Sequence, residues 1–320
     1  MRKLAVVAVA AIAVLAVDSA SAGERRELVI ASGEVTGYYY PVAGALCRVL
    51  NKDKPHGYTC VVAPTSGSAA NVAALRSGEA DLAILQSRAA SLAATGGEGF
   101  KDGPFPELRA VMSLHDESAL ALTRSGSGVE QLRDLKGKRV NLGRPGSFQR
   151  TMADAVLAAG GLSEGDMAPV VELDTADAAQ ELCDGNIDAA FFSGVHPMTE
   201  AASAIEQCGA VPVPLGGKSL ETTLKQSPWL AKTVIKGDTY DGLREDRPAL
   251  AVTAVLVATT RLPADEVYDI LKEIHANFPA LVRLHPVLNG LTKKRSARDG
   301  IAIPLHEGAA KFYADSGLAK

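Results

Sequence analysis

The chain has 320 residues, with 33 Lys and Arg against 37 Asp and Glu, and a formal net charge of −4. Nucleic-acid binding needs clustered Lys and Arg to neutralise phosphates, and the only basic run of three is 293–295, so a nucleic-acid partner is excluded. The length allows two domains. Many alanines and only 5% aromatic residues fit helices packed around a sheet.

The N-terminus has the features of a secretory signal peptide. Arg2 and Lys3 precede an unbroken apolar run at 4–17, and Ala20-Ser21-Ala22 supplies the small residues of a cleavage site. The run is shorter than the ~20 residues that a spanning helix needs. A buried N-terminal helix would instead need polar positions at helical spacing, and the run has none. We therefore expect residues 1–22 to be removed after Ala22 and the mature chain to be periplasmic.

From residue 28 onward, short β-branched segments alternate with alanine-rich segments. This alternation predicts an α/β fold with parallel strands, in which ligands lie beyond the carboxyl ends of the strands. Strands are predicted at 28–31, 58–63, 81–86, 120–124, 139–142, 189–192 and 211–213, and helices at 41–52, 69–76, 88–94, from the end of the loop 143–147 to about 159, at 176–183 and from 264 to 278 onward.

Two segments, 114–122 and 250–259, are predicted to cross between two lobes. The first lobe is then formed by residues 23–118 together with 258–320, and the second lobe by residues 119–257. The helix that begins at 264 returns the chain to the first lobe. Neither lobe is a sequence repeat of the other.

Four cysteines fit an oxidising compartment. Cys47 and Cys60 are 13 residues apart, and Cys183 and Cys208 are 25 apart. No C-x-x-C spacing is present, so zinc binding or thioredoxin-like chemistry is poorly supported. Four cysteines allow three pairings. The two local disulfides are favoured because each one joins parts of a single lobe, and four buried free thiols are the alternative.

No enzyme motif is found in the sequence. It contains no G-x-S-x-G, no G-x-x-x-x-G-K-[ST] and no H-E-x-x-H, and its six histidines include no pair at i, i+4. The sequence therefore predicts a protein that is not an enzyme, with no catalytic residue, metal or cofactor.

Glycine and hydroxyl residues precede two predicted helices, at Thr65-Ser66-Gly67-Ser68 and at Gly146-Ser147. A helix start leaves about four backbone N–H groups free and carries the positive end of the helix dipole. Such a start suits a carboxylate or phosphate group. The alternative is ordinary helix capping by serine. One such loop in each lobe, facing a cleft, predicts a small acidic ligand.

Several segments together resemble the TAXI family of periplasmic solute receptors, which serve TRAP transporters. The similarity runs in order from 28 to 318 and is carried by 37–44 (G-Y-Y-Y-P-V-A-G), 67–71 (G-S-A-A-N), 78–83 (G-E-A-D-L-A), Gln86-Ser87, 134–140 (D-L-K-G-K-R-V), 145–147 (P-G-S) and 304–309 (P-L-H-E-G-A). It implies a type II periplasmic-binding-protein fold, with two α/β lobes, a two-segment hinge and a ligand buried on closure. Members of known specificity favour acidic ligands such as glutamate or 2-oxoglutarate.

The resemblance also implies which residues contact the ligand. It assigns the contacts to four loops and to the loop after the strand at 189–192. The residues are Tyr39, Tyr40, Ser68, Asn71, Gln86, Ser87, Gly146, Ser147, Ser193, Gly194 and Val195. The implied partners are a small acidic organic ligand and the membrane subunits of a TRAP-type transporter, and the receptor is expected to be a monomer.

Three residues depart from the family pattern. Arg88 stands where relatives have an acid after Gln-Ser, Phe148 replaces a glycine, and Glu34 occupies a place that is normally glycine-rich. Arg88 has three alternatives: it clamps a ligand carboxylate in two-point fashion, pairs with Glu34, or points to solvent. Phe148 narrows the pocket or stacks on a flat ligand. Arg88 and Phe148 are added to the candidate ligand-binding residues.

The predicted function is an extracytoplasmic receptor that closes around a dicarboxylate or an acidic amino acid and delivers it to a TRAP transporter. Three alternatives remain open. An ABC importer or a sensor would use the same fold with another partner. An enzyme on the same scaffold would convert a bound metabolite. A surface antigen or adhesin would have a filled or absent cleft.

Overall fold

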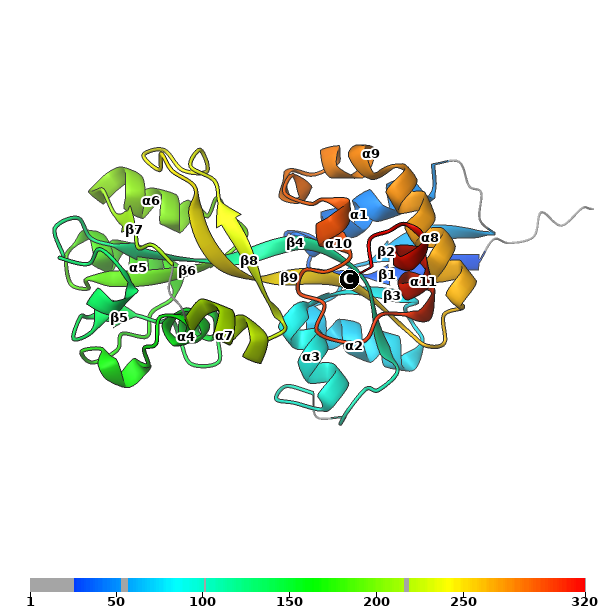
Figure 1. Cartoon of the computed structure of the whole chain (residues 1–320), viewed down its shortest axis with the longest axis horizontal. Helices are drawn as coiled ribbons and strands as arrows, with labels where there is room; N and C mark the ends of the chain where they lie inside the picture. The colour runs from blue at the N-terminus through cyan, green and yellow to red at the C-terminus, as the bar shows by residue number, and fades with distance from the viewer. Residues whose placement is uncertain (1–25, 53–56, 101, 216–218, 320) are drawn as a thin grey trace, which may run out of the picture.

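The computed structural model describes residues 26–52, 57–100, 102–215 and 219–319 (Figure 1). The predicted signal peptide, 1–22, lies outside these residues. Two lobes are joined by two long strands, β4 (Leu108–Thr123) and β9 (Arg247–Thr259), which run from one lobe into the other. Within the described ranges, no helix is long and apolar enough to cross a membrane. We call the part before β4 and after β9 lobe I, and the part between them lobe II.

One sheet extends through both lobes. Within the described residues it has nine strands, in the order β2-β1-β3-β9-β4-β6-β5, with β7 paired to β4 and β8 paired to β9. β1 is parallel to β2 and β3, and β5 is parallel to β6, whereas β4 and β9 pair antiparallel with their neighbours. The shorter strands are β1 (Arg26–Ala31), β2 (Tyr58–Ala63), β3 (Leu82–Gln86), β5 (Val140–Asn141), β6 (Ala189–Gly194), β7 (Val211–Pro212) and β8 (Leu230–Ile235).

The two crossing strands pair with each other from Leu108 opposite Thr259 to Ser118 opposite Ala251. β9 is buried from Ala249 to Thr259, which fits its nearly continuous run of Ala, Val and Leu, since a central strand is covered on both faces. The predicted crossings 114–122 and 250–259 lie inside these strands. The predicted lobe boundaries, after 118 and after 257, also fall within them. The predicted strand 120–124 is the lobe II end of β4, which begins at Leu108 and ends at Thr123.

Helices cover both faces of the sheet in lobe I, and Figure 1 shows α1, α8 and α9 on one side and α2 and α3 on the other. Two separate apolar clusters form, one including Leu46, Leu271 and Tyr313 and the other including Leu75 and Leu85. The helices are α1 (Tyr39–Leu50), α2 (Ser68–Ser77), α3 (Ser87–Thr95), α8 (Ala264–Ala276), α9 (Phe278–Arg283), α10 (Lys293–Ser296) and α11 (Glu307–Asp315), with a 3-10 turn at Pro286–Leu288.

Lobe II has its own core around Met152, Phe191 and Phe192, which are fully buried. Its helices are α4 (Phe148–Ala159), α5 (Thr175–Cys183), α6 (Thr199–Cys208) and α7 (Ser219–Gln226), with 3-10 turns at Leu132–Leu135 and Glu164–Asp166. The predicted α/β fold with two lobes and two connecting segments is therefore confirmed.

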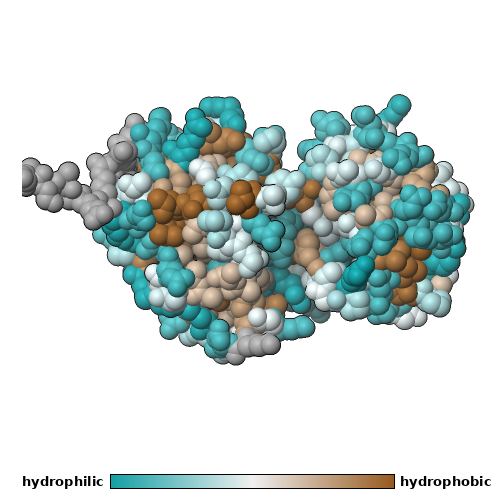
Figure 2. All heavy atoms as spheres, turned by 180° about the vertical axis from the view of Figure 1, so that it is seen from behind, coloured by the Kyte–Doolittle hydropathy of each residue, from teal (hydrophilic) through white to brown (hydrophobic). Residues whose placement is uncertain are grey.

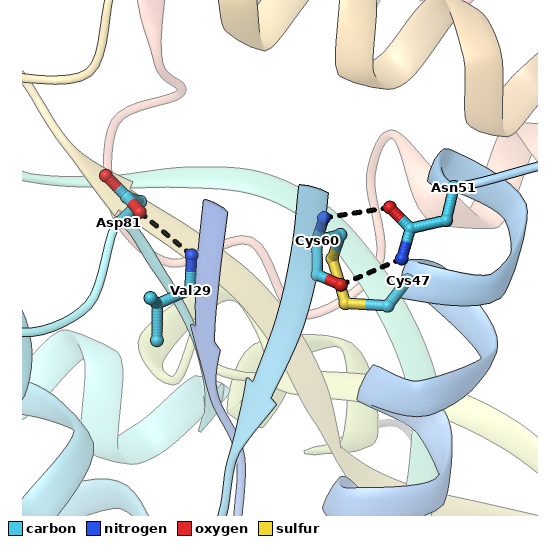
Figure 3. Close-up of a disulfide and its surroundings, with 5 residues drawn as sticks. All are labelled: Val29, Cys47, Asn51, Cys60 and Asp81. Atoms are coloured by element: carbon cyan, nitrogen blue, oxygen red, sulfur yellow. Dashed lines mark hydrogen bonds between the residues drawn. A yellow bond between two sulfur atoms is a disulfide. The ribbon is translucent and has the colours of Figure 1, made fainter. Parts of the chain in front are cut away.

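Both local disulfides are present, as predicted. Cys47 joins α1 to Cys60 in β2 with a Cα–Cα distance of 5.0 Å, and Cys183 joins α5 to Cys208 in α6 with 5.3 Å. The Asn51 side chain bonds both backbone groups of Cys60, each at 2.8 Å (Figure 3). Because β2 is an edge strand, the disulfide and Asn51 together attach it to α1.

Candidate functional site

A cavity of about 680 Å³ lies between the two lobes, within the size range of small-molecule sites. Figure 2 shows the lobes from behind as two masses that meet at a narrow waist. Lobe I and β4 line the cavity with Gly33, Glu34, Gly37, Tyr38, Tyr39, Gly67, Ser68, Gln86 and Glu117, and lobe II lines it with Gly194, Val195, Pro197, Met198, Thr199 and Glu200.

The lobe I wall is built where β1 and β3 end and α1 and α2 begin. Gly67 has φ 108°, a conformation that L side chains rarely adopt, and this turn places α2 at the cavity. The Ser68 hydroxyl accepts a hydrogen bond from the Gln86 backbone N–H at 3.2 Å, which ties the start of α2 to the end of β3. The wall thus lies at the carboxyl ends of parallel strands, the usual ligand position in such sheets.

Glu117 of β4 lies in the wall between Tyr39 and Gln86. The Tyr39 hydroxyl donates to Oε1 at 2.8 Å, and Gln86 Nε2 donates to Oε2 at 2.6 Å. Burial raises the pKa of the Glu117 carboxyl, and the two hydrogen bonds act in the opposite direction. Burial and the adjacent carboxylate raise the pKa of Tyr39 well above its usual value, so it remains a donor.

The lobe II wall consists of the end of β6, the loop after it and the first turn of α6. His196 holds this loop: Nε2 lies 3.1 Å from the Ser118 carbonyl oxygen and Nδ1 hydrogen-bonds to the Tyr240 hydroxyl. The same hydroxyl accepts the Met198 backbone N–H at 2.9 Å. Burial lowers the pKa of His196 to about 4, so the ring is neutral near pH 7. The loop is therefore fixed by neutral hydrogen bonds on both sides.

The charged side chains of the cavity are all acidic. Glu34, Glu117 and Glu200 line it, and among the described residues no lysine or arginine does. Like charges repel more strongly in a partly desolvated site than in water. The cavity wall thus disfavours a ligand of net negative charge.

A second, larger cavity of about 1060 Å³ adjoins the first and shares Tyr38, Val195 and Pro197 with it. His115 of β4 lines it, is 3% exposed, and neither ring nitrogen has a hydrogen-bond partner among the described residues. Burial lowers the pKa of His115 to about 3. Its ring centroid lies 5.7 Å from that of Tyr39. The two cavities therefore meet around the start of α1.

Five of the residues assigned by resemblance line the first cavity: Tyr39, Ser68, Gln86, Gly194 and Val195. They come from the ends of β3 and β6 and from the starts of α1 and α2. Sequence reasoning missed Tyr38, Glu117 and the run from Pro197 to Glu200. The signal for Glu117 was the polar triplet His115-Asp116-Glu117 inside an otherwise apolar crossing segment.

Asn71 and Ser87 are fully buried and hydrogen-bond to other parts of the protein. Asn71 Nδ2 donates to the carbonyl oxygens of Ser32 and Ile84, at 2.5 and 2.7 Å, and its Oδ1 accepts from Thr65. The Ser87 hydroxyl donates to the Trp229 carbonyl at 2.6 Å and accepts from the Thr253 N–H. Their assignment as ligand contacts is corrected, because these polar residues connect backbone segments.

Tyr40 and Ser193 do not line the cavity either. Tyr40 is half-buried on α1. Ser193 is buried within β6 opposite Ala119, and its hydroxyl has no partner among the described residues. Both residues are therefore next to a residue that lines the cavity, Tyr39 or Gly194, without lining it themselves.

The Pro-Gly-Ser helix start is also outside the cavity. Ser147 caps α4 by accepting the Arg150 N–H at 3.0 Å, Gly146 is exposed with φ 77°, and Phe148 packs against the core of lobe II. The ordinary capping alternative is correct for Ser147. The lobe II helix that begins at the cavity is α6, at Thr199.

The position of Arg88 differs from each of the three predicted alternatives. Its guanidinium carbon lies 5.8 Å from the centroid of the Trp229 ring, and the side chain is half-buried. Among the described residues, neither Arg88 nor Glu34 takes part in an ion pair. Because Trp229 belongs to lobe II, Arg88 contributes a contact between the lobes and lies outside the cavity.

The sequence matches the NMT1-like family over residues 30–317. The chain belongs to the NMT1-like family. Solved structures show its fold. A TctC solute binding protein from Polaromonas has a TM-score of 0.56 at 18% identity, covering 92% of this chain and 98% of that one. A putative periplasmic sulfonate-binding protein SsuA of a sulfonate ABC transporter from Methylobacillus flagellatus KT has 0.52 at 16%, covering 92% and 88%. This NMT1-like protein thus has the two-lobed fold of periplasmic binding proteins.

Proposed function

We propose that this NMT1-like protein is an extracytoplasmic solute-binding receptor. It binds a small polar molecule between its lobes and delivers it unchanged to a membrane transporter. The observation that supports this most strongly is the 680 Å³ cavity, which has one wall from each lobe and is lined by Glu117 of the connecting strand β4. The signal-peptide features of residues 1–22 support a periplasmic location.

Binding requires no chemical step. Tyr39, Gln86 and Glu117 contact the solute from one side, and Thr199 and Glu200 of α6 complete the site from the other. Bending of β4 and β9 closes the lobes and expels water. Micromolar affinity needs only about 8 kcal/mol, which a few charge-assisted hydrogen bonds and aromatic burial supply. The transporter then recognises the closed form.

The resemblance to TAXI receptors supports a TRAP-type transporter as the membrane partner. An ABC importer is the second candidate, because the SsuA neighbour is described as part of an ABC transporter. Uptake into membrane vesicles supplied with the receptor separates the two, since an ABC importer requires ATP hydrolysis. ATP-independent uptake supports the TRAP assignment.

The receptor function is tested by thermal denaturation and small-angle scattering of the purified exported protein with a panel of amino acids, amines, dicarboxylates and sulfonates. A bound solute raises the melting temperature by mass action, and closure lowers the radius of gyration. Mass spectrometry of the recovered solute should show no conversion, whereas turnover would support the enzyme alternative. The proposal fails if the folded protein responds to no solute by either measurement.

A further inference from the structure

We propose that the solute carries a protonated nitrogen, as an ammonium or guanidinium group, and that this group binds the carboxylate of Glu117. The inference rests on the proposed receptor function and narrows its ligand class. It departs from the dicarboxylate ligand that the resemblance implies.

The first argument is the unfinished coordination of Glu117. Each carboxylate oxygen accepts one hydrogen bond, from Tyr39 or from Gln86, and an ionised carboxylate has about four acceptor positions. Both donors are neutral. Among the described residues, no ion pair includes Glu117. Glu117 is half-buried where it faces the cavity, and a cation from the solute offsets the cost of removing its remaining water when the lobes close.

The second argument is the charge around Glu117. Glu34 and Glu200 line the same cavity from opposite lobes. Their negative charge attracts a cation into the space in front of Glu117 and repels a second carboxylate there. Closure brings the α6 wall, which carries Glu200, toward Glu117 and strengthens this selection.

The third argument is His115, two residues before Glu117 on the same strand. It is buried, lines the adjoining cavity and has no hydrogen-bond partner among the described residues. A neutral imidazole offers one acceptor nitrogen, and its lowered pKa keeps it neutral beside a cation. The same imidazole also carries one N–H, and Lys232, Lys236 and Arg295 line the adjoining cavity, so His115 adds a single acceptor two residues from Glu117 and the preference for a cation comes from the first cavity.

The starts of α1 and α2 favour an anionic group elsewhere on the same solute. The proposal concerns only the group at Glu117 and allows a carboxylate at the far end of the solute. It excludes a solute whose only charged groups are carboxylates.

Three four-carbon probes of matched length test the proposal by calorimetry on the purified exported protein: succinate, 4-aminobutyrate and 1,4-diaminobutane. At least one amine should bind more tightly than succinate. Glu117→Gln should weaken that amine at least about tenfold, or about 1.4 kcal/mol. Glu98→Gln, at an exposed loop position of lobe I outside the cavity, is the matched control and should leave affinity unchanged.

The outcomes separate the ligand class from the receptor function. Tight binding of succinate or another dicarboxylate, with weak amines, overturns the cation proposal and leaves the receptor function intact. An amine affinity unchanged in Glu117→Gln also overturns it, because a neutral hydrogen bond then accounts for binding. A folded protein that binds neither these probes nor any solute of the wider panel overturns both. Circular dichroism confirms the folding of each variant.

Discussion

Arg295 of α10 donates a hydrogen bond to Asp116 of β4 at 2.6 Å, and the Thr233 hydroxyl of β8 donates to the same oxygen at 2.5 Å. Asp116 therefore joins a lobe I helix and a lobe II strand at the crossing. Arg295 is also held by Asp299 at 2.6 Å. The carboxylate at the centre of this group helps to set the angle between the lobes.

Replacing Thr233 with Val removes the lobe II contact and keeps the Asp116–Arg295 pair. We expect the free energy of unfolding to fall by about 1.5–3 kcal/mol, because a hydrogen bond to a charged group is lost. The distribution of lobe distances should broaden, as measured by single-molecule fluorescence with one dye on each lobe. Thr239→Val is the control, because Thr239 lines the larger cavity together with Thr233. An unchanged distance distribution would show that the contact does not restrain the lobes.

The disulfides should each stabilise the fold by about 3 kcal/mol, since their loops span 13 and 25 residues. Replacing both Cys47 and Cys60 with Ala should lower the urea midpoint, and the Cys183/Cys208 double variant should act additively because the bridges lie in different lobes. Reductant should have no further effect on the variant that lacks all four cysteines. Equal midpoints for the wild type and either double variant would contradict this.

Stability should fall as the pH is lowered from about 6.5 toward 4. Burial lowers the pKa of His115 to about 3 and that of His275 to about 4, so both stay neutral in the folded state while the unfolded chain binds protons. Each such histidine lowers the free energy of unfolding by about 1.4 kcal/mol for every pH unit within this range.

His115→Leu isolates one of these contributions by urea denaturation at several pH values. The slope of unfolding free energy against pH should decrease by about one proton, and stability near pH 7 should change little, because no hydrogen bond is lost. The raised pKa of Glu117 makes the folded protein more stable as the pH falls, which is the opposite effect. Because Glu117 is present in both the wild type and His115→Leu, its contribution cancels from the comparison. An identical slope would show that His115 is protonated in the folded protein.

Replacing Arg88 with Ala should leave solute affinity within about tenfold of the wild type, since a direct contact is worth about 1.4 kcal/mol or more. It should lower the free energy of unfolding by up to about 1 kcal/mol through loss of its contact with the Trp229 ring. Calorimetry and urea denaturation measure the two effects. A larger loss of affinity without loss of stability would restore the ligand-clamp alternative.

The affinity for 1,4-diaminobutane should decrease as the pH falls through the raised pKa of Glu117. The probe keeps both charges across this range, so the change reports protonation of the protein. Glu117→Gln should abolish most of the dependence in a calorimetric titration series. A dependence that persists in the variant would assign the proton to another group.

The sequence predicted the alternation of strands and helices well, because most of these elements lie entirely within one lobe. The spacing of the cysteines along the chain also favoured the two disulfides that the structure contains. The sequence underestimated the lengths of β4 and β9, because a strand shared by two lobes has different neighbours in each lobe. The strand β8 was missed altogether, since its alternation of buried and exposed residues is short and imperfect.

The site was only partly predictable for a related reason. Tyr39, Ser68 and Gln86 follow strands whose carboxyl ends meet at one edge, so their convergence follows from the topology. Asn71 and Ser87 carry the same polar chemistry, but whether a polar side chain serves a ligand or a buried backbone group depends on tertiary packing. Glu117 belongs to a strand interior, where sequence patterns place core residues.

The position of Glu117 on a crossing strand has a consequence for engineering this protein as a sensor. β4 is continuous from the helices of one lobe to those of the other, and Glu117 lies one residue after Asp116 on it. Substitutions chosen to retune selectivity at this point will also alter the stiffness of the connection. Designs should therefore vary recognition at Thr199 or Glu200 first, because both lie on α6, away from the two strands that connect the lobes.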